Sequence, residues 1–313
     1  MASSKTPLYT ALAANLGIAA TKFVAASITG SSAMLSEGIH SLVDTLNEVL
    51  LLLGISRSQR PPDQKRPFGY GREQYFWSYV VALLIFAVGG GVSFYEGVTH
   101  MQHPELIEDP FWNYIVLGIA FVLDGYSLIT AWRAFTIQRG SQPFWAAIKD
   151  SKDSATFTVL FEDASDVLGL IIAFLGVFLG HIFKNPYLDG LASIFIGLLL
   201  VAVAVVLARE SKSLLLGEGV DAATSNQLVA LTEADPAVLK AIQIATIYLG
   251  PEEITLAQGV VFQPDLTTDA INKAIVRIHN SIRQDFPAIK HAYTQPMAMP
   301  ENQAGLPKTG VDR

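Results

Sequence analysis

The chain has 313 residues, of which 51% are hydrophobic and only 16% are charged, whereas an average soluble domain has about 25% charged residues. The net charge of −7 argues against nucleic acid as a partner, and a sequence without cysteine excludes disulfides and thiolate metal sites. The apolar residues gather in long runs, which favours a membrane protein over a soluble enzyme. The HExxH, GxSxG and Walker A patterns are absent from the sequence, so an intramembrane metalloprotease, a hydrolase of that type and an ATP-driven pump lack support.

Six apolar stretches are long enough to cross a bilayer, because a hydrocarbon core about 30 Å thick needs roughly 20 helical residues. These predicted spans are Tyr9–Thr29, Ala33–Gly54, Phe76–Val98, Phe111–Thr136, Thr156–Gly180 and Tyr187–Leu207.

The basic residues of the short connections indicate the orientation of the spans. The second and fourth connections, together with the adjoining end of the fourth span, carry Arg57, Arg60, Lys65, Arg66, Arg72, Arg133, Arg139, Lys149 and Lys152, whereas the alternate connections carry Lys184 alone. Because basic residues accumulate on the cytoplasmic side, we expect both termini to be cytoplasmic.

The chain changes character after the sixth span. Residues 1–209 form the predicted six-span domain, and residues 210–296 have the polar density of a soluble domain. There the patterns predict a helix, two strands, a helix and a strand, at Thr224–Ala234, Ile242–Leu249, Ile254–Phe262, Thr268–Asp285 and Ile289–Thr294. This order predicts a small α+β domain. Residues 297–313, rich in proline, glycine and polar residues, form a predicted disordered tail.

Two predicted spans carry ionisable residues, which are costly in lipid unless they are paired, hydrated or bound to a cation. His40 and Asp44 are four residues apart in the second span and therefore share one helix face. Glu162, Asp163 and Asp166 cluster in the fifth span. Taken alone, His40 and Asp44 could simply form hydrogen bonds within a helix bundle. Together the two clusters favour a divalent metal site between helices.

Two further ionisable residues in the predicted spans have possible roles other than that of a primary ligand. Asp124 in the fourth span could belong to a second layer around the metal or to a proton path. Lys22 in the first span is expected to be a counter-ion or a tie between helices rather than a ligand.

Four separated motifs stand out in the sequence: Ser31–Asp44, Arg66–Arg72, Leu160–Asp163 and Leu188–Ser193. They resemble motifs of the cation diffusion facilitators, and of their zinc transporter 9 branch in particular. The resemblance implies a homodimer in which each protomer has six transmembrane helices followed by a cytoplasmic ferredoxin-like α+β domain. It also implies a divalent-cation/proton antiporter that works by alternating access.

The family's membrane site uses two residues four apart on the second span and two four apart on the fifth. His40 and Asp44 match the first pair. On the fifth span, alignment on Gly169 selects Asp163 and leaves Val159 at the other ligand position, whereas four-residue spacing selects Glu162 and Asp166. We expect Asp163 to be the primary ligand, with Glu162 and Asp166 as supporting ligand or proton carrier.

The expected function is export of a divalent transition metal from the cytoplasm in exchange for protons. Zinc is the first choice, and manganese, iron or cobalt would also suit one histidine among carboxylates. The expected partners are the metal ion, protons, membrane lipid and a second copy of the chain, with no permanently bound cofactor. The expected location is a bacterial inner membrane. The alternative is a non-transporting membrane scaffold or metal sensor.

Overall fold

The computed structural model describes residues 5–104 and 110–299. The chain divides into two compact units, one of Met1–Ser58 and Glu73–Lys212, the other of Gln59–Arg72 and Ser213–Arg313. In the predicted tail, Met297 donates its backbone N–H to the carbonyl of Val260 (2.9 Å). Residues 300–313 of that prediction lie outside the described residues.

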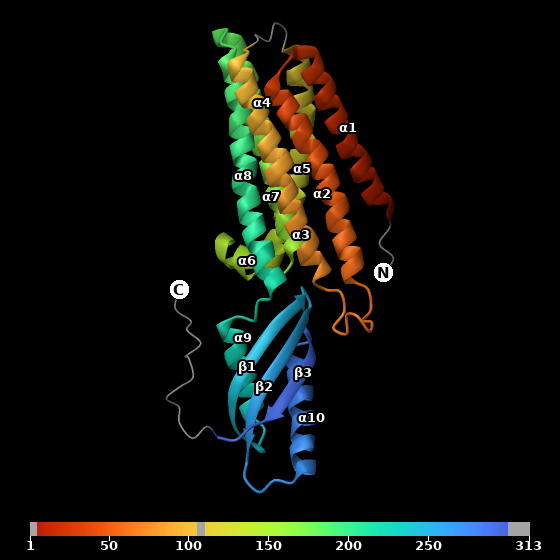
Figure 1. Ribbon diagram of the computed structural model, residues 1–313, viewed down its shortest axis with the longest axis vertical. Helices are drawn as coiled ribbons and strands as arrows, with labels where there is room; N and C mark the ends of the chain where they lie inside the picture. Colours follow the sequence, from red (N-terminus) through yellow and green to blue (C-terminus); the bar gives the residue numbers. More distant parts are fainter. Residues whose placement is uncertain (1–4, 105–109, 300–313) are drawn as a thin grey trace. The chain divides into compact units, whose positions relative to one another are not determined.

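The first unit is built from helices (Figure 1). They are α1 (Lys5–Thr29), α2 (Ser32–Ser58), α3 (Glu73–Leu84), the π-helical turn η1 (Ile85–Gly90), α4 (Gly91–Gln102), α5 (Phe111–Arg139), α6 (Phe144–Asp150), α7 (Ser154–Phe183) and α8 (Tyr187–Leu216).

Five helical segments of the described residues are long and apolar enough to cross a membrane: Ser32–Ser58, Glu73–Gln102, Phe111–Ile137, Ser154–Phe183 and Tyr187–Leu216. They correspond to the second to sixth predicted spans. The first predicted span coincides with α1, a helix of 25 residues that is not among the five. Its crossing of the membrane therefore stays a prediction. The short helix α6 had no counterpart in the predicted elements.

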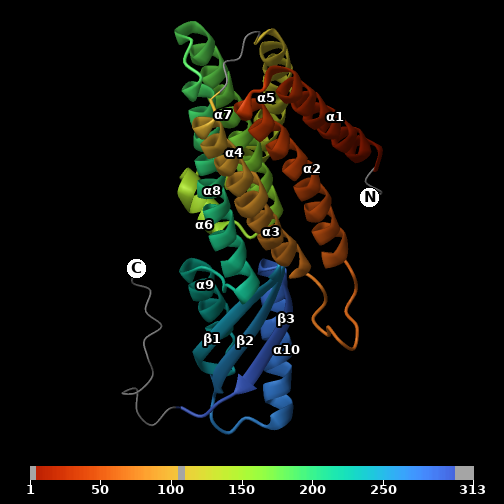
Figure 2. The same ribbon diagram turned by 45° about the horizontal axis from the view of Figure 1, so that its top comes forward.

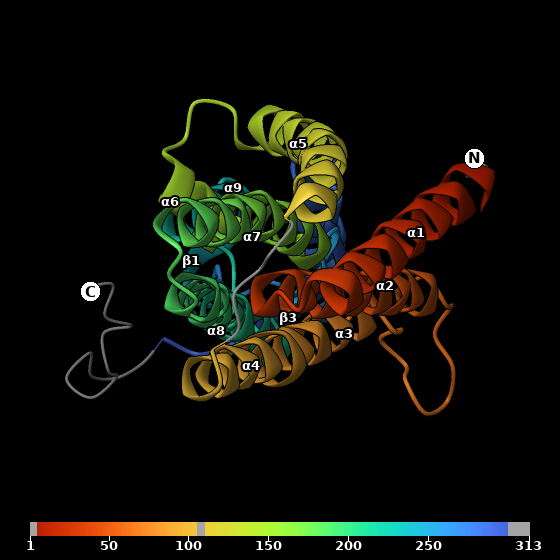
Figure 3. The ribbon, with the colours of Figure 1, turned by 90° about the horizontal axis from the view of Figure 1, so that it is seen from above.

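The helix α2 lies among several partners. It packs along α1 and also contacts α3, α4 and α7, while α7 packs against α5. The view from above shows α1 and α2 running side by side and α7 next to α5 (Figure 3). This arrangement places the two spans that carry the predicted ligands against each other.

Glycines let the third span approach α8 closely. A methyl group at Gly97 would lie 2.7 Å from the backbone nitrogen of Ile194, and one at Gly197 would lie 2.7 Å from that of Phe94. A real side chain does not fit at these distances, so both positions require glycine for backbones to pack this closely.

The N-terminus of α2 is capped by a residue from another helix. Gly30, with a φ of 68°, turns the chain between α1 and α2. The buried carboxylate of Asp189 on α8 then accepts hydrogen bonds from the backbone N–H groups of Ser32 (2.6 Å) and Ala33 (3.3 Å). It also accepts from the hydroxyls of Ser31 and Ser32 (2.6 and 3.0 Å). These bonds satisfy donors that a helix start otherwise leaves without partners.

The second unit contains a three-stranded sheet (Figure 2). Its elements are α9 (Ala222–Glu233), β1 (Val238–Gly250), β2 (Glu253–Phe262), α10 (Thr268–Asp285) and β3 (Ile289–Pro296). β2 is the central strand, antiparallel to β1 and parallel to β3. The predicted order of helix, two strands, helix and strand is confirmed.

Two of these elements begin two or more residues before the predicted start, and β3 extends to Pro296 rather than ending at Thr294. α9 begins two residues early because the carboxylate of Asp221 caps it by accepting from the N–H of Thr224 (2.8 Å). β1 begins at Val238 rather than Ile242. Irregular pairing between Val238 and Gln243 disrupts the alternation by which a strand is recognised.

Both helices of this unit cover the same face of the sheet. Ile254, Leu256 and Val260 alternate along β2 and form one buried cluster with Leu228 of α9 and Ile278 of α10. Since side chains two apart along a strand share a face, the core lies between that face and the two helices.

The loop between α2 and α3 belongs to the second unit. The Phe68 ring meets the His291 ring edge-on, with centroids 5.5 Å apart. A methyl group at Gly71 would collide with the carbonyl oxygen of Leu249. Within the loop, Asp63 accepts hydrogen bonds from two backbone N–H groups and from the hydroxyl of Tyr70, and these bonds lower the pKa of Asp63. The segment contains the predicted family motif Arg66–Arg72, but its packing on the second unit was not predicted.

Candidate metal centre

Two residues of α2 and one of α7 come together inside the first unit. His40 and Asp44 are one helical turn apart, and their side chains meet Asp166 of α7. The Nε2 atom of His40 lies 3.6 Å from Asp44 Oδ1 and 3.5 Å from Asp166 Oδ1. One ligand atom from each residue falls within 4.8 Å of the others. Two ligands on one tetrahedral zinc ion at bond lengths of about 2.0–2.1 Å are about 3.4 Å apart. The side chains therefore need little movement to share an ion.

The three side chains are largely removed from solvent. His40 is 1% exposed and Asp166 is 9% exposed. Both carboxylate oxygens of Asp44 and the Oδ1 of Asp166 accept no hydrogen bond from any described residue. Buried carboxylates without donors are costly unless a cation or a proton neutralises them. The group is thus suited to exchange a metal ion for protons.

Glu162 lies one turn before Asp166 and also faces α2. Its Oε1 accepts a hydrogen bond from the amide of Asn47 (2.7 Å), which follows Asp44 by three residues on α2. The Glu162 carboxylate is buried beside the three residues but is held by this amide. The sequence does not predict this partner for Asn47. Its spacing of three residues from Asp44 does place it on the same helix face as His40 and Asp44.

Asp163 points toward α5 instead of α2. It accepts a hydrogen bond from the hydroxyl of Ser127 (2.9 Å) and is not one of the three residues whose ligand atoms converge. Ser127 gave no signal in the sequence, because a serine in an apolar helix is common. The structure thus divides the fifth-span cluster, with Glu162 and Asp166 toward α2 and Asp163 toward α5.

A polar cavity of about 290 Å³ connects these two groups of residues. It is lined by side chains from α1, α2, α5 and α7, with five carboxylates among them: Asp44, Glu48, Asp124, Asp163 and Asp166. The cavity has room for several water molecules, so Asp163 and Asp124 can be hydrated while Asp44 and Asp166 also face the candidate ligands.

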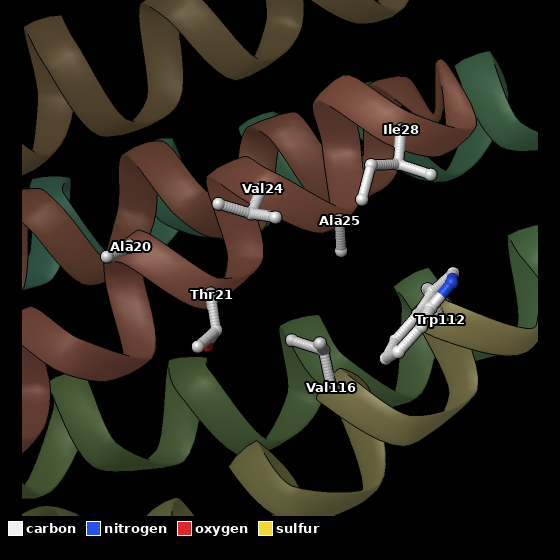
Figure 4. Close-up of a pocket in the computed structure, with 7 residues that line it drawn as sticks. All are labelled: Ala20, Thr21, Val24, Ala25, Ile28, Trp112 and Val116. Carbon is white, nitrogen blue, oxygen red and sulfur yellow. The ribbon is translucent and has the colours of Figure 1, made fainter.

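A second cavity, of about 270 Å³, lies between α1 and α5 and has a different character (Figure 4). The residues that line it carry no ionisable group: Ala20, Thr21, Val24, Ala25, Ile28, Trp112 and Val116. It offers no ligand for a metal ion.

An ion pair lies next to the candidate ligands. The Lys22 ammonium of α1 is 3.0 Å from Glu37 Oε2, and both side chains are fully buried. Lys22 also donates a hydrogen bond to the hydroxyl of Ser41 (2.7 Å). The position of Lys22 between α1 and α2 fits the expectation of a counter-ion or helix tie.

The fold and the site together define a helical membrane protein with a buried group of cation ligands and a small α+β unit. Residues 8–216 match the family described as the cation efflux transmembrane domain. The chain belongs to this family, the cation diffusion facilitators, and within it to the branch of the zinc antiporter SLC30A9. The resemblance found in the sequence motifs is therefore confirmed.

Relatives of this chain occur in animals and bacteria. The mitochondrial proton-coupled zinc antiporter SLC30A9 of Xenopus laevis is 35% identical over 269 residues, which cover 84% of this chain and 48% of that protein. Its human counterpart is 35% identical over 249 residues, 79% of this chain and 44% of that protein. The manganese efflux system protein MneP of Bacillus subtilis is 25% identical over 223 residues, 67% of this chain and 68% of that protein.

The chain spans about half the length of the zinc antiporters it matches. All three relatives are named as transporters, in agreement with the expectation of a transporter rather than an enzyme.

Proposed function

We propose that this protein is an antiporter that moves a divalent transition metal, zinc first, against protons. The observation that carries the proposal is the convergence of one imidazole nitrogen and two carboxylate oxygens within 4.8 Å, on two helices of a membrane protein. One nitrogen and two or more oxygens suit zinc, and they also suit manganese, iron or cobalt. The names of the relatives support zinc and manganese among these ions.

In this proposal, His40, Asp44 and Asp166 are the inner ligands of the transported ion. Glu162, one turn from Asp166 and beside Asn47, is a fourth ligand when it leaves the amide. Asp163, in the cavity lined by carboxylates, carries protons or receives the ion on its way to the site. The sequence-based assignment of Asp163 as the primary ligand is the competing arrangement, and the experiment below separates the two.

Coupling follows from competition for one set of atoms. Metal binding requires deprotonated carboxylates and a neutral imidazole, so protons and the metal exclude each other. Two buried carboxylates that carry neither are strongly disfavoured in a membrane. A carrier that changes the side of access only when loaded with metal or with protons therefore exchanges one for the other, which is antiport by alternating access.

Direction and assembly are part of the same proposal. The excess of basic residues in the second and fourth connections supports cytoplasmic termini. The name of the manganese efflux relative MneP supports export of metal from the cytoplasm. We place the protein in a bacterial inner membrane, with MneP as a bacterial relative. The SLC30A9 relatives are mitochondrial, so fractionation of the native cell is the test. A homodimer in lipid is the expected assembly, and cross-linking in membranes tests it.

The decisive experiment measures transport in proteoliposomes with a pH-sensitive dye inside. An inward zinc gradient should drive proton efflux, and a panel of manganese, iron and cobalt should rank below zinc. Asp166→Asn and Asp163→Asn are matched variants, since each neutralises one carboxylate with almost no change in volume. Asp166→Asn should abolish zinc binding, whereas Asp163→Asn should bind zinc and transport it slowly.

The reverse result, lost binding in Asp163→Asn with normal binding in Asp166→Asn, would establish the family-based register. Zinc binding without metal-driven proton flux in the wild-type protein would instead identify a scaffold or metal sensor.

A further inference from the structure

We infer that Glu37, whose buried charge Lys22 compensates, is a positioning residue for the transported ion. Glu37 holds His40 so that Nδ1 donates toward Glu37 and Nε2 remains free for the metal. The inference rests on the proposed function and adds a layer of residues outside the ligands.

The two nitrogens of the His40 ring face different surroundings. Nε2 is the atom directed at Asp44 and Asp166. Nδ1 is buried and has no hydrogen-bond partner in the part of the chain that the structure describes. A histidine that binds a metal through one nitrogen usually donates its other N–H to a carboxylate or carbonyl, which fixes the tautomer and the ring. A buried acceptor is therefore needed on the Nδ1 side.

Glu37 supplies a carboxylate oxygen on that side. Its Oε2 pairs with Lys22, but its Oε1 is buried and unpartnered among the described residues. Oε1 and His40 Nδ1 both lie against Gly169 of α7. A methyl group on Gly169 would collide with Glu37 Oε1 and would stand 3.8 Å from Nδ1. The unused donor and the unused acceptor thus face the same side-chain-free position.

Lys22 compensates the charge of this acceptor and ties it to α1. A lone carboxylate as deeply buried as Glu37 would be strongly destabilised, and an opposite charge at 3.0 Å compensates it. The second bond of Lys22, to Ser41 next to His40, ties the ammonium to the same turn of α2. Three helices therefore converge behind the imidazole: α1 through Lys22, α2 through Glu37 and α7 through Gly169.

The test compares two double variants that both remove the ion pair. Lys22→Met with Glu37→Gln leaves a neutral side chain whose amide oxygen still accepts from Nδ1. Lys22→Met with Glu37→Leu leaves a side chain of similar size without an acceptor. The readout is zinc affinity of the purified full chain in detergent, by competition with a fluorescent zinc chelator. The glutamine variant should stay within about three-fold of wild type, and the leucine variant should lose about 10- to 100-fold, the usual cost of removing such a partner.

A matched control loosens α1 elsewhere. Thr29→Val with Asn113→Leu removes the 2.9 Å hydrogen bond between α1 and α5 and should leave zinc affinity unchanged. Equal affinities in the two Lys22–Glu37 double variants would overturn the inference, because a mere helix tie is lost in both. Loss of affinity in the control would overturn it as well. A wild-type chain that binds no zinc would overturn the proposed function itself.

A single substitution tests the same inference if the double variants do not fold. Gly169→Ala places a methyl group against Glu37 Oε1, near Nδ1, and displaces that oxygen. Alanine also favours helix formation, so the protein should fold and bind zinc about ten-fold more weakly. Gly125→Ala on α5 meets no atom within 4 Å and serves as its control. Unchanged affinity in Gly169→Ala would refute the inference.

Discussion

Replacement of Asp189 by alanine removes the cap that α8 provides for α2. The carboxylate is 2% exposed and accepts from two backbone N–H groups and two serine hydroxyls. The hydroxyls can rotate toward other acceptors, but the N–H groups of Ser32 and Ala33 are fixed by the helix. Each buried donor left without a partner costs about 1–3 kcal/mol. The expected loss for Asp189→Ala is therefore about 3 kcal/mol.

Asp189→Asn should cost less than alanine. It keeps one carbonyl oxygen for the N–H groups and loses the charge, so about 1–2 kcal/mol is expected. The assay is thermal unfolding of the purified protein in detergent. With about 2–4 °C per kcal/mol for a unit of this size, Asp189→Ala should lower Tm by about 6–12 °C.

The control for Asp189 is Asp221→Ala, which removes the exposed cap of α9 in the second unit. Water replaces an exposed cap, so its cost should be about 1 kcal/mol and should leave the first unit unaffected. A Tm for Asp189→Ala within about 1 °C of wild type would refute the capping argument. Equal losses in Asp189→Ala and Asp189→Asn would refute the part assigned to the remaining carbonyl.

Two further predictions concern orientation and pH. Because the sequence has no cysteine, Gln64→Cys and Gln102→Cys each introduce the only thiol of the protein. A membrane-impermeant thiol reagent applied outside should label position 102 and should not label position 64. The opposite pattern would contradict cytoplasmic termini. Burial and the nearby Arg283 charge lower the pKa of His279 from 6.5, so the unfolded chain binds more protons than the folded unit. The second unit should therefore lose stability as the pH falls below 6.5. In unfolding curves measured over a series of pH values, His279→Gln should reduce the dependence of the unfolding free energy on pH. An unchanged pH dependence would show that His279 is not the group responsible.

The sequence was most informative where a pattern repeats along one element. The isoleucines of α10 recur at helical spacing, and the helix begins and ends at the predicted residues, Thr268 and Asp285. β1 was predicted too short because its irregular pairing is a property of the partner strand, which a local pattern does not contain.

The candidate site divides in the same way. His40 and Asp44 lie on one helix, so their spacing alone put them on one face. The fifth-span residues were ambiguous because adjacent carboxylates differ by about 100° around a helix, and the rotation of α7 decides which one faces α2. That rotation depends on packing against α2 and α5. The rotation of α7 is visible in two hydrogen bonds: Glu162 accepts from Asn47 of α2, and Asp163 accepts from Ser127 of α5.

The grouping of residues 59–72 with the second unit changes what a C-terminal truncation would do. The chain passes from one unit to the other after Ser58, after Arg72 and after Lys212. A protein cut at Lys212 would retain Phe68 and Gly71 but lose the residues they pack on, His291 and Leu249. The linker between α2 and α3 would then lose its packing contacts with the second unit. Loss of transport in such a truncated protein could therefore result from the altered linker as well as from the missing strands. A single truncation does not remove the second unit without also affecting residues 59–72.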